Sequence, residues 1–141
     1  MEKIKVLFVC IHNSGRSQMA EAFLNRLGSG VFEAQSAGLE AGVLNPLVVK
    51  AMAEIGYDLS RNRTKRAEDF LRAGEKFGYV ITVCDAAGAE KCPFFPGPAK
   101  KLHWSFEDPA GFTGSESERL NQTRRVRDLI RDKVAEFIRN R

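Results

Sequence analysis

No hydrophobic run in the 141-residue sequence approaches the roughly 20 residues that a membrane-spanning helix needs. Its apolar runs, such as residues 6–11 and 80–84, are far shorter. The N-terminus also lacks the apolar stretch and small-residue cleavage site of a secretory signal, and enters a strand-like segment almost at once. We therefore expect a soluble, cytoplasmic protein with no membrane partner.

Histidine and cysteine are scarce as well. Two histidines cannot build a histidine-rich metal site, so we expect both to be structural and predict no metal and no bound cofactor. Three cysteines are an odd number, and in a reducing compartment they are better explained as reactive thiols than as structural bridges. Each cysteine is therefore a candidate functional residue.

The excess of positive charge is small and local. The net charge is +4, and residues 116–141 hold eight basic and five acidic side chains. A solvated basic helix is the favoured interpretation, and a patch that steers anionic substrates is the alternative. Neither exposed aromatics between basic residues nor a nucleotide-binding Walker motif is present, so we predict no nucleic-acid partner and no nucleotide hydrolysis.

Strand-like and helix-like segments alternate along the chain. Strands are predicted at residues 3–10, 31–37, 78–84 and 100–104. The helices are predicted from Ser14 to Gly28, from Asn45 and Pro46 to Gly56, over residues 67–73, and from Glu116 onward. This order predicts one α/β domain over residues 1–141, with a parallel sheet and helices on both faces. The closing helix should bury an apolar stripe made of Leu120, Val126, Leu129, Ile130, Val134, Phe137 and Ile138.

The segment after the first strand has the composition of an oxyanion-binding loop. Cys10 ends the strand and Arg16 follows six positions later, where a helix begins. Backbone N–H groups of such a loop can converge on a tetrahedral anion at the positive end of the helix dipole, and Arg16 can add a bidentate fork. The same positive field favours the thiolate form of Cys10. The predicted oxyanion-binding residues are Ile11, His12, Asn13, Ser14, Gly15, Arg16 and Ser17.

Side chains within this loop strengthen that interpretation. Asn13 tolerates left-handed backbone angles, and Ser14 and Ser17 offer hydroxyl groups to the thiolate. The alternative is that Cys10 is an ordinary buried cysteine and Arg16 a surface helix residue. The strand before the loop and the helix after it favour the functional interpretation.

A thiolate that attacks an oxyanion needs an acid to protonate the departing oxygen. Asp108 follows the fourth strand and should emerge at the edge of the sheet where the cysteine loop lies. Asp108 is therefore the candidate acid, and the alternative is that it simply opens a turn before Pro109.

These residues resemble the low-molecular-weight protein tyrosine phosphatase family, through the segment from Cys10 to Ser17 and the Asp108-Pro109 pair. The resemblance extends nearly from end to end and is narrower for the thioredoxin-coupled arsenate reductases. It implies a three-layer α/β/α sandwich around a four-stranded parallel sheet of order 2-1-3-4. The motifs that carry the narrower resemblance are residues 13–21, 36–38, 45–46, 103–104 and 108–111.

Departures from the phosphatase pattern favour the reductase branch. The phosphatases usually have proline at the position of Gln18 and tyrosine at that of Ala110. The resemblance further implies that Cys84 and Cys92 act as a pair of electron-transferring thiols. Some of these reductases bind potassium, but the basic Thr64-Lys65-Arg66 segment stands where a carboxylate would be expected, so no potassium site is predicted.

The resemblance therefore predicts arsenate reduction. Cys10 would attack arsenate with help from Arg16 and Asp108, and Cys84 and Cys92 would then carry the resulting oxidation to thioredoxin or a similar thiol reductant. Phosphate and sulfate are the expected competing oxyanions, and we expect a monomer. Two alternatives are a protein tyrosine phosphatase that uses only Cys10, Arg16 and Asp108, and a non-catalytic redox or oxyanion sensor.

Overall fold

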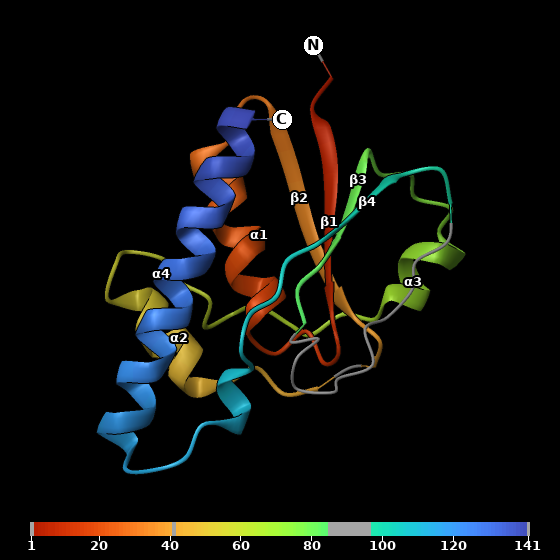
Figure 1. The fold of residues 1–141 in the computed structure, drawn as a ribbon. Helices are drawn as coiled ribbons and strands as arrows, with labels where there is room; N and C mark the ends of the chain where they lie inside the picture. Colours follow the sequence, from red (N-terminus) through yellow and green to blue (C-terminus); the bar gives the residue numbers. More distant parts are fainter. Residues whose placement is uncertain (1, 41, 85–96, 141) are drawn as a thin grey trace.

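The sheet of the protein has four parallel strands in the order β2-β1-β3-β4, as seen in a computed structural model that describes residues 2–40, 42–84 and 97–140. The strands are β1 (Ile4–Cys10), β2 (Phe32–Gly38), β3 (Tyr79–Thr82) and β4 (Lys100–His103). All three pairings are parallel, so all four strands end at the same edge (Figure 1). The predicted strand order is confirmed.

The helices cover both faces of this sheet. They are α1 (Arg16–Leu27), α2 (Pro46–Ala53), α3 (Ala67–Arg72) and α4 (Glu116–Asn140), with a short 3-10 turn η2 (Pro109–Gly111) after β4. Helices α1, α2 and α4 lie on one side of the sheet and α3 on the other, which gives the three-layer sandwich (Figure 1). The Asn45 side chain accepts a hydrogen bond from Leu47 N at 2.9 Å and caps α2, as the Asn-Pro pair predicts.

Alternation along β1 divides the core in two. Val6, Phe8 and Cys10 face α1 and α4 in the larger cluster. Leu7 and Val9 face the smaller cluster formed with α3. A strand buried on both faces reads as a continuous apolar run, which is why β1 was recognisable from the sequence.

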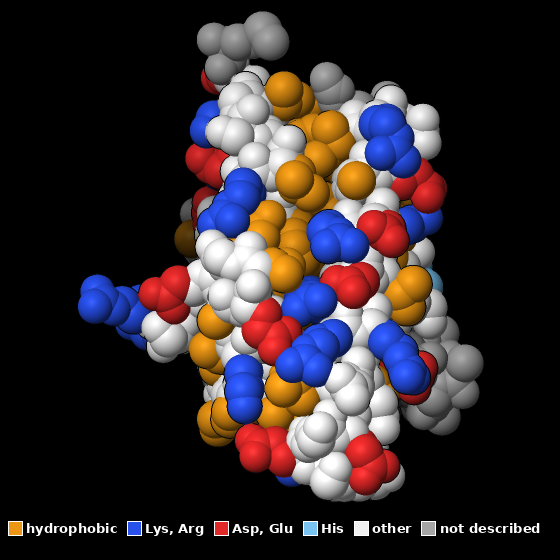
Figure 2. Space-filling model, turned by 90° about the vertical axis from the view of Figure 1, so that its left-hand side faces the viewer, with side chains coloured by type: hydrophobic (Ala, Val, Ile, Leu, Met, Phe, Trp, Pro, Cys, Tyr) orange, Lys and Arg blue, Asp and Glu red, His pale blue; other side chains and the backbone are white. Residues whose placement is uncertain are grey.

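Helix α4 packs on α1 and α2 through the predicted stripe, with one error. Ile130 and Val134 are fully buried, but Leu129 is 59% exposed and does not belong to the buried face. Positive and negative side chains intermingle on this side of the molecule (Figure 2). Arg124 and Arg127 of α4 both bind the Glu54 carboxylate at the end of α2, with N–O distances of 2.9 and 3.1 Å. These arginines therefore join two helices.

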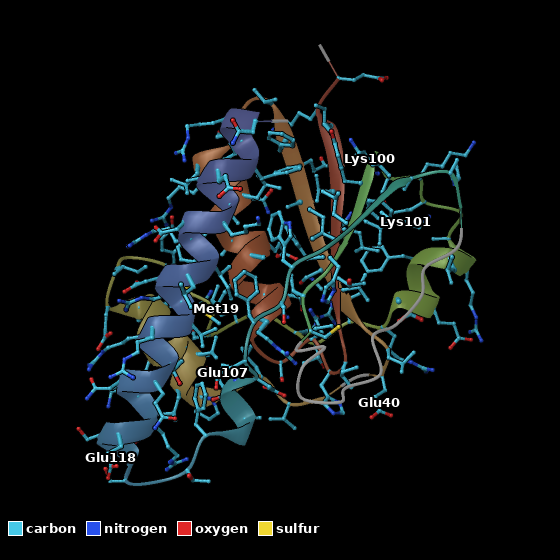
Figure 3. The ribbon with its side chains drawn as sticks, in the orientation of Figure 1. Met19, Glu40, Lys100, Lys101, Glu107 and Glu118 are labelled. Atoms are coloured by element: carbon cyan, nitrogen blue, oxygen red, sulfur yellow. The ribbon has the colours of Figure 1, made fainter. Side chains whose placement is uncertain are left out.

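Charged side chains lie at both edges of the sheet. Lys100 and Lys101 begin β4 at the amino edge, whereas Glu40 and Glu107 lie toward the carboxyl edge (Figure 3). Among the described residues, no helix is long and apolar enough to cross a membrane.

Candidate functional site

The loop between β1 and α1 has the backbone expected of an anion-binding turn. Asn13 is fully buried and has a φ angle of +55°, the left-handed conformation that asparagine tolerates. Helix α1 begins at Arg16 rather than at Ser14, because residues 11–15 form the turn. The amino end of α1 therefore points into the loop, where its dipole favours a negative charge.

Cys10 is a free, buried thiol whose sulfur is surrounded by donors. Asn13 N donates to Cys10 Sγ at 3.1 Å, and Ser17 Oγ lies 2.9 Å from the same sulfur. Asn13 Nδ2 in turn donates to Ser17 Oγ at 2.7 Å. The Cys10 sulfur therefore lies within a network of polar groups contributed by the loop and by the first turn of α1.

The other predicted loop residues contribute their main chain. Ile11 O accepts a hydrogen bond from Glu40 N, and Ser14 O accepts one from Asn45 N. Ser17 Oγ lies beside the Cys10 sulfur, whereas the contacts of the described residues include none between the Ser14 hydroxyl and this sulfur. Of the two predicted hydroxyl groups, that of Ser17 is in contact with Cys10 in this structure.

Two glycines, Gly38 at the end of β2 and Gly42 in the segment that follows, allow the chain to pack directly on the loop. A Cβ atom at Gly38 would lie 2.8 Å from Asn13 N and from His12 C. A Cβ at Gly42 would lie 2.8 Å from His12 Cβ. Contacts this short are not tolerated, so both positions require glycine. Nothing in the sequence alone indicated a structural role for these glycines, although close backbone approach is a common reason for glycine.

Arg16 connects the loop to the predicted acid. Its guanidinium is buried, with Nη1 donating to Phe106 O at 3.0 Å and Nη2 lying 3.4 Å from Asp108 Oδ2. The other carboxylate oxygen of Asp108 accepts a hydrogen bond from Ala110 N at 3.0 Å and caps the η2 turn. Asp108 therefore both opens a turn and reaches the site, so the two interpretations of this residue are compatible.

Neither histidine side chain approaches the Cys10 sulfur among the described contacts. His12 is half-exposed, with Nδ1 3.4 Å from Glu40 Oε1, and His103 Nδ1 lies 2.7 Å from Thr82 Oγ1. Within the part of the chain that the structure describes, no cluster of His, Cys, Asp and Glu side chains could hold a metal ion. At the position where a carboxylate would be expected, the Lys65 ammonium lies 3.0 Å from Glu21 Oε1.

Cys84 is fully buried at the carboxyl edge of the sheet. Strand β3 ends at Thr82, two residues before the predicted end, but Val83 N still donates to Val9 O at 2.9 Å and keeps the chain beside β1. Cys84 therefore leaves the sheet next to the strand that carries Cys10. Cys92 and the small-residue segment before it lie outside the described residues.

Comparison with known proteins agrees with this geometry. Residues 5–140 match the low molecular weight phosphotyrosine protein phosphatase family. An arsenate reductase from Shouchella clausii is 42% identical over 138 residues, which are 97% of this chain and 96% of the relative.

Solved structures of arsenate reductases share the fold. One in a phosphate-binding state superposes with a TM-score of 0.78 at 32% identity, covering 97% of this chain and 98% of the other. A thioredoxin-dependent arsenate reductase from Corynebacterium glutamicum has a TM-score of 0.67 at 29% identity, covering 99% of this chain and 62% of the longer one. The chain thus belongs to the low molecular weight phosphotyrosine protein phosphatase family and, within it, to the arsenate reductases.

Proposed function

We propose that this protein reduces arsenate to arsenite through a relay of Cys10, Cys84 and Cys92, with electrons from thioredoxin. The observation that carries this proposal is that Cys10 and Cys84 leave neighbouring parallel strands at the same edge of the sheet. A phosphatase needs only the first of these thiols, whereas a disulfide relay needs a second one nearby.

The first step is attack of the Cys10 thiolate on arsenic. The loop amides and Arg16 hold the arsenate oxygens, and Asp108 gives a proton to the oxygen that leaves as water. An arsenic–sulfur bond forms and an arsenic–oxygen bond breaks, while arsenic stays pentavalent. Arg16 exchanges part of its contact with Asp108 for the bound anion, which frees the carboxyl group to face the departing oxygen.

The second step is the redox step. The Cys84 thiolate attacks Cys10 Sγ, the electron pair of the arsenic–sulfur bond passes to arsenic, and arsenite leaves with trivalent arsenic. A Cys10–Cys84 disulfide remains. Cys92 then attacks Cys84, Cys10 is released as a thiolate, and the two thiols of thioredoxin reduce the Cys84–Cys92 disulfide.

The proposal extends to the setting of this reaction. A thioredoxin-type reductant is supported by the similarity to the thioredoxin-dependent reductase of Corynebacterium glutamicum. Phosphate and sulfate should compete with arsenate, because they have similar shape and charge. We propose that residues 1–141 act as one domain and as a monomer in the cytoplasm.

The relay is tested by counting arsenite released per enzyme. With thioredoxin, thioredoxin reductase and NADPH, the native protein should turn over many times. Cys84→Ser should stop at the arsenic adduct and release almost no arsenite. Cys92→Ser should release about one arsenite per enzyme and stop at the Cys10–Cys84 disulfide, because the resolving thiol is missing.

Alkylation of Cys10 by iodoacetamide without arsenate provides the control, since an intact loop should react at the native rate in both variants. The phosphatase alternative predicts the opposite pattern. Steady hydrolysis of para-nitrophenyl phosphate that survives both substitutions, with no NADPH oxidation above background, would exclude the reductase.

A further inference from the structure

Gln18 is a fully buried polar side chain on the first turn of α1, directly behind the oxyanion loop. Its Nε2 atom lies 3.0 Å from Asn13 Oδ1, 3.2 Å from Asn13 O and 2.9 Å from Arg63 O. Its Oε1 atom accepts a hydrogen bond from Asn62 Nδ2 at 3.0 Å. One amide thus joins the loop to a segment about 45 residues further along the chain.

The direction of the hydrogen bonds around Asn13 follows from one backbone group. Lys65 N lies 2.9 Å from Asn13 Oδ1, and a backbone N–H can only donate, so this end of the Asn13 amide is the oxygen. The NH₂ end must then face Ser17 Oγ, 2.7 Å away. Ser17 Oγ accepts this bond, so its own proton is available for the Cys10 sulfur at 2.9 Å.

In each hydrogen bond of this series, the residue farther from the sulfur is the donor. Gln18 donates to Asn13, Asn13 donates to Ser17, and Ser17 donates to Cys10. If the Asn13 amide turned over, its oxygen would face Ser17 and draw the hydroxyl proton away from Cys10. Gln18 opposes that rotation, because its NH₂ group donates to the same oxygen as Lys65 N. The Gln18 amide is itself oriented by Arg63 O on one side and Asn62 on the other.

We propose that Gln18 is a positioning residue for Cys10. Gln18 holds the Asn13 amide in the orientation that directs the Ser17 proton to the Cys10 sulfur. The inference rests on the proposed function only in taking Cys10 as the nucleophile, and it applies whatever oxyanion the loop binds. Gln18 is uncharged, so it orients the donors without adding charge to the site.

Several charged groups near this network form ion pairs. Arg16 meets Asp108 at 3.4 Å, Lys65 meets Glu21 at 3.0 Å, and Ser36 Oγ donates to the same Glu21 oxygen at 2.7 Å. Around the other side of the loop, His12 lies 3.4 Å from Glu40.

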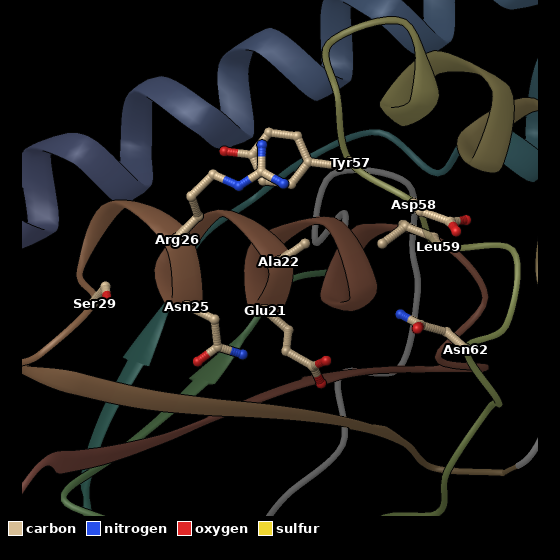
Figure 4. Close-up of a pocket in the computed structure, with 9 residues that line it drawn as sticks. All are labelled: Glu21, Ala22, Asn25, Arg26, Ser29, Tyr57, Asp58, Leu59 and Asn62. Carbon is tan, nitrogen blue, oxygen red and sulfur yellow. The ribbon is translucent and has the colours of Figure 1, made fainter.

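The network begins close to solvent. Asn62 and Glu21 line one open pocket of about 510 Å³ between α1 and the 57–62 segment (Figure 4). Gln18 lies between this pocket and the buried sulfur. The outer contact, from Asn62, can therefore be removed without entering the core.

The test measures Cys10 reactivity in Gln18→Leu, which keeps the approximate volume and removes the amide. The reduced protein is alkylated with iodoacetamide across a pH series and digested with trypsin, and the peptide of residues 6–16 reports on Cys10 alone. The pH of half-maximal alkylation should rise by up to about one unit, because Asn13 Oδ1 keeps only one of its two donors and the Ser17 proton is directed to the sulfur for less of the time.

Asn62→Ala provides a second measurement that leaves the core intact. Removing the bond that orients the Gln18 amide should raise the half-maximal pH by roughly a few tenths of a unit. If Gln18→Leu does not fold, Asn62→Ala is the test of the proposal. An unchanged pH of half-maximal alkylation in Asn62→Ala would then overturn it.

Asn25→Ala is the matched control. Asn25 is also an amide on α1, and it bonds both Ala34 N and Ala34 O on β2 with no contact to Asn13. This variant should lower the melting temperature and leave Cys10 alkylation unchanged. A folded Gln18→Leu protein with native alkylation, or an equal shift in Asn25→Ala, would contradict a specific role for Gln18. Because no arsenate is used, failure of arsenate reduction would leave this result standing.

Discussion

Two segments meet at the carboxyl edge of the sheet, and they are held in different ways. The oxyanion loop after β1 is fixed by buried contacts among its own residues and with the segments after β2 and α2, such as Asn13 to Ser17 and Asn13 to Lys65. The acid segment after β4 contacts the site through Arg16, and the Asp108 carboxylate remains about one-third exposed. The anion-binding part is preorganised, whereas the position of the acid depends on a contact that the anion can replace.

Arg16 stands at the end of the oxyanion loop and contacts the acid segment, so its substitution should have the largest effect. In Arg16→Lys, one ammonium cannot hold Phe106 O, Asp108 and two anion oxygens together, and kcat/KM for arsenate should fall by about 10³-fold. The measurement is arsenite release at subsaturating arsenate. Arg26→Lys on the same helix, whose guanidinium stacks on Tyr57, should stay near native activity. A kcat/KM for arsenate within threefold of the native value in Arg16→Lys would mean that the Arg16 guanidinium does not hold the anion.

Asp108→Asn sharpens the comparison further. The variant loses the acid but also the negative charge that competes for Arg16. We expect kcat to fall by about 10²-fold, while inhibition by phosphate becomes at least as strong as in the native protein. Glu107→Gln, one residue before, controls for the loss of one charge at this edge. Weaker phosphate inhibition in Asp108→Asn would show that Asp108 supports anion binding.

Glu54→Gln should have the smallest effect and should spare the site. A hydrogen bond from Arg124, with a second from Arg127, lowers the pKa of Glu54 below its ordinary value of 4.5. A lowered folded-state pKa stabilises the protein above the ordinary pKa, and this contribution is lost as the pH falls through the folded value.

The melting temperature of the native protein should therefore fall more steeply below about pH 4.5 than that of Glu54→Gln. At pH 7 the variant should melt a few degrees lower at most, since exposed ion pairs contribute little. Arsenite release should be unchanged, and a loss of activity would connect this distant helix contact to the site.

Local sequence signals and the family resemblance together predicted much of this molecule. Strand order followed from the family resemblance, and the conformation of Asn13 and the cap at Asn45 followed from residue preferences that act over a few positions. The placement of Asp108 beside Arg16 followed from the shared edge of parallel strands.

Contacts between distant residues were not predictable in the same way. The sequence marks Gln18 only through the family resemblance, since nothing near it in the chain indicates that Asn62 will supply its partner. The exposure of Leu129 depends on how α4 is rotated about its axis against α1 and α2. Helical spacing alone does not determine whether Leu129 or only its neighbour Ile130 faces the core. Strand β3 ends at Thr82, which is the last residue that pairs with both β1 and β4.

Cys10 pairs with Gly38 in the parallel register of β1 and β2. The conformation of the loop therefore depends on the number of residues in β2. Inserting one residue within β2 would bring a side chain to the place that Gly38 leaves empty, against Asn13 N and His12 C. The evolutionary consequence is that β2 should accept substitutions on its outer face far more readily than any change in its number of residues.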